Sequence, residues 1–182
     1  MQNILKHKKF LLLIIIIITI SLICGYFYYY SIDDDIKVNL LKNLNNYNIF
    51  NYNNIIKDLT IMSTILILSF FFIGLPLCIT YLGYETFIIG FFINMFLNIY
   101  KIKGLSILLI YITIRVIPLF LIIMFLKKII NISKLNFKYL INREEFLKSK
   151  IMYNFYNSLY IIIFVVIINI VTYIFSKNVN IA

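Results

Sequence analysis

Residues 10–32 form an uninterrupted run of 23 residues without a charged side chain. A helix needs about 20 mainly apolar residues to cross the hydrocarbon core of a bilayer. The whole chain is 63% hydrophobic and 13% charged, with a mean hydropathy of +0.96, and these values exclude an ordinary soluble globule or a disordered chain. The run therefore predicts a spanning helix over residues 10–29. We interpret it as a retained anchor; a cleaved signal peptide and a lipoprotein leader are the alternatives.

Four further apolar stretches predict an all-α integral membrane bundle of five transmembrane helices, with residues 1–182 forming a single membrane domain. The expected spans are residues 10–29, 59–83, 84–100, 105–126 and 153–175. Between them we predict an outer loop over residues 31–58 and a basic inner loop over residues 127–150. The third span is the shortest, and a re-entrant hairpin of the second and third spans is the alternative.

Basic residues set the expected orientation. The N-terminus holds three lysines and residues 127–150 hold seven Lys or Arg. Four expected spans separate these two segments, so both fall on one side. The positive-inside rule then predicts a multi-pass cell-membrane protein with a cytoplasmic N-terminus and an extracytoplasmic C-terminus. Orientation accounts for the net charge of +10, so nucleic acid is not an expected partner. Membrane lipid is one, because residues 127–150 resemble a basic interfacial helix attracted to anionic lipid.

Arg115 is the one charged residue deep in an expected span. Its insertion costs about 2.5–3.5 kcal/mol, so it should face protein or water. On the expected span boundaries Asn94 lies at a similar depth, whereas Glu85 lies at the inner surface. Pro118 removes a backbone hydrogen bond next to Arg115. We predict a structural polar node of Arg115, Asn94 and Pro118, with an ion or substrate path as the alternative.

Small and amide residues form a stripe on the third expected span. Gly90, Asn94 and Asn98 are spaced four apart and share one helix face, which suits close helix packing in lipid. Pore lining is the alternative. Gly74 and Pro76 interrupt the second expected span, either as a packed kink or as a broken helix that forms a binding site.

The outer loop is the expected docking surface for an extracytoplasmic partner, since 28 residues are too few to bury a core of their own. Part of it has the spacing of an apolar helix face, and an Asn-rich part suits the membrane surface. Its apolar and aromatic residues are Ile36, Leu40, Leu44, Tyr47, Phe50 and Tyr52. A simple solvated connection is the alternative.

Signals for catalysis are missing from the sequence. The one histidine, His7, lies outside the expected spans, and the five glycines form no phosphate-binding loop. No acids or histidines follow Glu144 and Glu145 in the way that a glutamyl membrane protease requires. We therefore predict no catalytic, cofactor-binding or metal-binding residue, and no enzymatic activity.

Three short motifs resemble stage II sporulation protein M and its wider family. The first is the sequence Phe-Ile-Gly-Leu-Pro-Leu at residues 72–77. The second is a third span that begins near Gly83, contains Gly90 and ends in a short turn at Gly104. The third is Ile-Pro at residues 117–118. The chain length and the five-span layout match the family along most of the sequence.

The resemblance implies a bacterial, non-catalytic membrane scaffold. Family members tether peptidoglycan-degrading partners, an amidase/endopeptidase and a lytic transglycosylase, during engulfment in sporulation. Cell-wall hydrolases on the outer side would then be the partners, in engulfment or related peptidoglycan remodelling, with residues 31–58 as the available surface. A transporter or permease subunit is the second hypothesis, based on Arg115, the prolines and the polar stripe. An unrelated membrane function is the third.

Overall fold

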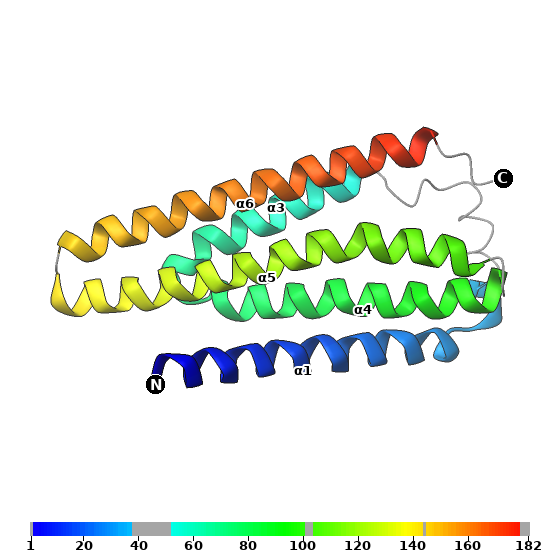
Figure 1. The fold of residues 1–182 in the computed structure, drawn as a ribbon, viewed down its shortest axis with the longest axis horizontal. Coiled ribbons are helices and arrows are strands. Elements are labelled where there is room, and N and C mark those ends of the chain that lie inside the picture. The colour runs from blue at the N-terminus through cyan, green and yellow to red at the C-terminus, as the bar shows by residue number, and fades with distance from the viewer. Residues whose placement is uncertain (1, 38–51, 101–103, 144, 179–182) are drawn as a thin grey trace. The chain divides into compact units, whose positions relative to one another are not determined.

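The computed structural model describes residues 2–37, 52–100, 104–143 and 145–178, and these ranges contain helices and no strand, which confirms the all-α class there (Figure 1). Residues 34–37 form a helical turn. The elements are α1 (Gln2–Ser31), α3 (Tyr52–Leu68), the 3-10 helix η1 (Ser69–Phe71), α4 (Gly74–Tyr100), α5 (Gly104–Asn142) and α6 (Glu145–Asn178).

Within the described ranges, four helices are long and apolar enough to cross a membrane. These segments are Phe10–Ser31, Gly74–Asn98, Tyr111–Asn142 and Glu145–Ile174. A helix satisfies its own backbone hydrogen bonds, which is the requirement for crossing lipid. The fifth long helix, α3, has only 17 residues and carries Lys57 and Asp58 near its start. The chain is therefore compatible with a multi-pass membrane protein, and α3 is the shortest of these five long helices.

The predicted boundary between the second and third spans is wrong. It was placed at residues 83 and 84, but α4 runs without a break from Gly74 to Tyr100. The break lies instead at residues 69–73, inside the stretch predicted as the second span. Hydropathy does not mark this turn, because residues 59–84 carry no charge on either side of it.

The turn between α3 and α4 is tight. Phe72 adopts a left-handed conformation with φ 62°, which is uncommon for a residue with a bulky side chain. Gly74 follows where a Cβ atom would lie 2.5 Å from the Ile65 carbonyl oxygen, so the close approach requires glycine. Pro76 occupies the first turn of α4, where a missing backbone N–H costs little. Both residues thus begin a helix, and neither kinks one.

The prediction of a basic inner loop over residues 127–150 is also wrong, because most of this segment is helical. Helix α5 continues to Asn142 and α6 begins at Glu145. Arg143 closes α5 with φ 53°, and its N–H donates to the Tyr139 carbonyl at 2.8 Å. The helices persist because this segment buries an apolar stripe. Its members are Ile129, Ile132, Leu147 and Ile151.

The helices divide into two compact units. The first contains residues 1–34 and 81–116, and the second contains residues 35–80 and 117–182. In the second unit α3 packs along α6, and α5 and α6 form a long hairpin (Figure 1). Whether the two units make up the predicted single domain stays a prediction.

Candidate functional site

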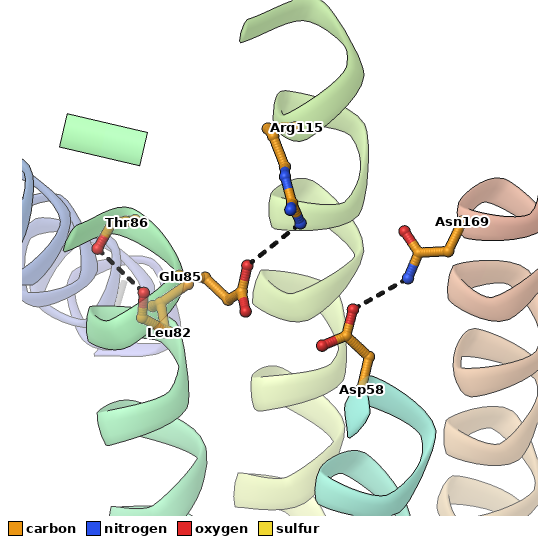
Figure 2. Close-up of polar contacts among 6 residues, drawn as sticks. All are labelled: Asp58, Leu82, Glu85, Thr86, Arg115 and Asn169. Carbon is orange, nitrogen blue, oxygen red and sulfur yellow. Dashed lines mark hydrogen bonds and ion pairs between the residues drawn. The ribbon is translucent and has the colours of Figure 1, made fainter. Parts of the chain in front are cut away.

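An acid and a base meet inside the first unit. Arg115 Nη1 on α5 lies 3.8 Å from Glu85 Oε2 on α4, and the two side chains point toward one another (Figure 2). The Arg115 and Glu85 side chains are only 15% and 11% exposed. Opposite charges at this separation attract strongly where water is excluded. The pair therefore ties α4 to α5 within segments apolar enough to span a membrane.

Tyr111 completes this site one helical turn before Arg115. Its ring centroid lies 5.8 Å from the Arg115 guanidinium carbon, within the range of a cation–π contact. The ring also packs against Phe92 and Phe96 of α4, at centroid distances of 5.2 and 5.7 Å. The Tyr111 hydroxyl is buried and lies close to the Arg115 side chain.

The predicted node of Arg115, Asn94 and Pro118 names the wrong partner for Arg115. Arg115 pairs with Glu85, whereas the Asn94 amide donates a hydrogen bond to a backbone carbonyl of α1. The cause is the misplaced span boundary. Glu85 is eleven residues into α4, or about 16 Å from the helix start, and not at a helix end. Pro118 is buried within α5, which continues through it.

The sequence contains a signal for this pair. Glu85 is the sole charged residue of residues 59–100, and Arg115 is the sole charged residue of residues 104–126. Two isolated charges of opposite sign in neighbouring apolar segments are expected to pair, since each is expensive alone. Correct helix ends would have placed each of them eleven residues inside its helix.

The polar stripe on α4 faces α1. Asn94 Nδ2 donates to the Tyr26 carbonyl at 2.6 Å. A Cβ atom on Gly90 would lie 2.1 Å from the Leu22 carbonyl oxygen, and one on Gly25 would lie 2.0 Å from that of Phe87. The two backbones therefore approach as closely as in small-residue helix contacts of membrane proteins. Asn98, further along α4, is exposed and donates to the Asn94 carbonyl at 2.9 Å.

In the second unit, polar side chains of α5 donate hydrogen bonds to backbone carbonyls of the α3–α4 turn. Ser133 Oγ donates to the Ser69 carbonyl at 3.0 Å, and Asn136 Nδ2 donates to the Phe70 carbonyl at 2.6 Å. Carbonyls released at a helix end need such partners when water is excluded. The turn that holds Gly74 is therefore joined to α5 by hydrogen bonds.

A second buried acid lies between α3 and α6. Asn169 Nδ2 donates to Asp58 Oδ2 at 3.0 Å (Figure 2), and Asp58 is 8% exposed. Sequence reasoning assigned Asp58 to the outer loop and missed this contact. Between Ser158 and Thr172 on α6, every residue except Tyr160 and Asn169 is apolar. This isolated amide is the signal in the sequence that could have predicted the contact.

Most of the predicted docking surface lies outside the described residues. This applies to Leu40, Leu44, Tyr47 and Phe50. Ile36 belongs to the helical turn at residues 34–37 and is 50% exposed, and Tyr52 is the first residue of α3.

No group of three or more His, Cys, Asp or Glu that could hold a metal ion occurs within the described ranges. The predicted lack of enzymatic activity stays a prediction. Comparison of the chain with models of known families, with curated proteins and with solved structures gives no match.

Proposed function

We propose that the protein is a non-catalytic membrane scaffold that holds peptidoglycan hydrolases at the cell membrane, as the resemblance to stage II sporulation protein M implies. The observation that carries the scaffold role is the Glu85–Arg115 pair. The two isolated ionisable side chains of α4 and α5 form an ion pair with each other, and this pair holds the two helices together. The Asn94–Tyr26 and Asn169–Asp58 contacts are used in the same way.

The proposed topology has five crossings, with α3 as the fifth spanning helix and the N-terminus in the cytoplasm. Helix α3 of 17 residues extends about 25 Å, close to the thickness of a hydrocarbon core. A crossing by α3 places the basic N-terminus and the basic α5–α6 hairpin on one side, in agreement with the positive-inside rule. Residues 31–51 then lie on the outer side, where wall hydrolases act.

A pull-down of wall-degrading activity tests the recruitment. The tagged full-length protein is purified in mild detergent from its host, and the bound fraction is assayed for peptidoglycan hydrolysis in a zymogram. We expect hydrolase activity with the native chain, and its loss when residues 43–51 are replaced by a Gly/Ser linker of equal length. This replacement ends before α3 begins at Tyr52.

The matched control is Lys148→Gln, a change on the exposed surface of α6 at the opposite end of the proposed topology. It should retain the hydrolase activity. Recruitment through the outer loop is refuted if the native chain retains no hydrolase, or if the linker variant retains as much as the native chain.

A transporter or permease subunit is the second candidate. The buried Glu85–Arg115 pair beside the Tyr111 ring favours it, because ionisable residues inside spanning segments often mark substrate or ion pathways. A flux assay in proteoliposomes separates the two functions. Selective uptake that is lost in Arg115→Ala would favour transport over the scaffold.

A further inference from the structure

The α3–α4 turn exposes consecutive apolar side chains. Phe71 is 67% exposed, Phe72 41% and Ile73 54%. The Phe72 ring lies 5.8 Å from the ring of Phe137 on α5, which is itself 55% exposed. We call these four residues the apolar edge. Such a run of exposed apolar residues is unfavourable in water and marks a surface that is covered by an apolar phase or partner.

The segment that carries the turn is free of charge. No Asp, Glu, Lys or Arg occurs from Leu59 to Tyr84. The turn can therefore lie at the boundary between acyl chains and headgroups without placing a charged group of its own in the lipid. Its released carbonyls at Ser69 and Phe70 already accept hydrogen bonds from α5, so they do not require water.

Two lysines lie next to the apolar edge. Lys134 and Lys138 are both exposed on α5, and their spacing of four places them on one helix face. Lys134 directly follows Ser133, which is hydrogen-bonded to the turn, and Lys138 directly follows Phe137. A lysine beside apolar surface extends its stem along that surface and presents its ammonium group at the level of the headgroups.

More positive charge follows at the tip of the α5–α6 hairpin, which extends past the α3–α4 turn (Figure 1). Arg143, Lys148 and Lys150 are exposed there. Lys150 Nζ lies 4.1 Å from the centroid of the Phe146 ring, and Phe146 is 64% exposed. Basic groups combined with exposed aromatic rings are typical of surfaces that bind the membrane interface.

We propose that the apolar edge, together with Lys134 and Lys138, is a binding surface for anionic phospholipid. The four apolar side chains insert between the acyl chains and the headgroups, and the two ammonium groups bind lipid phosphates. A basic residue near an anionic surface strengthens association by about fivefold, so two lysines produce a clear preference for anionic lipid. The surface is built from two hairpins and differs from the single interfacial helix predicted over residues 127–150. It does not depend on the scaffold role.

Tryptophan fluorescence tests this surface directly, because the chain contains no Trp. The full-length protein with Phe71→Trp is reconstituted in vesicles of phosphatidylcholine and phosphatidylglycerol, with brominated acyl chains on one lipid or the other. We expect brominated phosphatidylglycerol to quench the reporter at a several-fold lower mole fraction than brominated phosphatidylcholine. Adding Lys134→Glu and Lys138→Glu should remove this preference and leave quenching by phosphatidylcholine in place.

Two controls keep the result interpretable. A Phe27→Trp reporter, at a 62% exposed position on α1, should be quenched equally by the two lipids. Lys134→Gln with Lys138→Gln replaces the charge reversal if that variant does not fold. Equal quenching of the Phe71→Trp reporter by the two lipids would overturn the proposal. Strong quenching by aqueous iodide would also overturn it, since the turn would then face water and suit a soluble partner.

Discussion

Glu85 on α4 and Arg115 on α5 lie 3.8 Å apart, and each is the sole charged residue of its apolar stretch. A charged side chain at the centre of a spanning helix is expensive when it is alone. Pairing reduces that cost and fixes the register between the two helices. The pair therefore constrains how α4 and α5 pack in the first unit, and several expected outcomes depend on it or on the corrected ends of α4.

The accessibility of Tyr84 reports whether α4 crosses lipid as one helix. Tyr84 lies ten residues after the start of α4, or about 15 Å along the helix. In a background with Cys24→Ala and Cys78→Ala, a Tyr84→Cys variant should resist a membrane-impermeant maleimide in intact vesicles. An Asn142→Cys variant, at the exposed end of α5, should react from one side. Equally fast labelling of the two positions would contradict a continuous spanning helix over Gly74–Asn98.

The proposed orientation makes a separate prediction in the same cysteine-free background. Lys138→Cys should be labelled only after cells are permeabilised, because the proposed topology puts the α5–α6 hairpin in the cytoplasm. Ile36→Cys, in the predicted outer loop, should be labelled in intact cells. The reverse pattern would invert the topology, and with it the proposed recruitment of wall hydrolases from the outer side.

Two glycines of α4 should respond differently to the same substitution. Gly90→Ala places a methyl group 2.1 Å from the Leu22 backbone oxygen, which cannot move without shifting α1. We expect a loss of about 1–3 kcal/mol in the free energy of unfolding. At Gly83 the nearest atom to an added methyl group is the Ser21 side-chain oxygen at 3.2 Å. Gly83→Ala should therefore be close to neutral, with a small gain from helix propensity.

Thermal unfolding of both variants in the same detergent measures the difference. The close approach of α1 and α4 is contradicted if Gly90→Ala is as stable as Gly83→Ala.

The sequence was sufficient to predict the helical class, because long runs without charge leave few alternatives in lipid. It was not sufficient to place the turn before α4. Glycine at 74 and 83 and proline at 76 all suggested breaks, yet the left-handed residue is Phe72. A phenylalanine in that conformation is held by packing and by hydrogen bonds from Ser133 and Asn136, which are more than 60 residues away in the chain.

That one misplaced turn also explains the misassigned partner of Arg115. With a span starting at residue 84, Glu85 lies at a membrane surface and Asn94 becomes the matching polar group. With α4 starting at Gly74, Glu85 moves to mid-helix and Asn94 is left to bond with α1. Side-chain contacts between helices depend on helix ends to within a few residues, and hydropathy alone does not define ends inside a long uncharged stretch.

A double-mutant cycle on Glu85 and Arg115 tests most directly that the buried charges join helices. The free energy of unfolding is measured in one lipid system for the native chain, Glu85→Leu, Arg115→Leu and the double variant. Removing one partner of a buried pair costs about 3–5 kcal/mol because it strands the other charge, whereas replacing both by apolar residues is often neutral. We predict two unstable single variants and a double variant close to the native chain. A double variant that loses the sum of the two single effects, or single variants that lose nothing, would contradict the account.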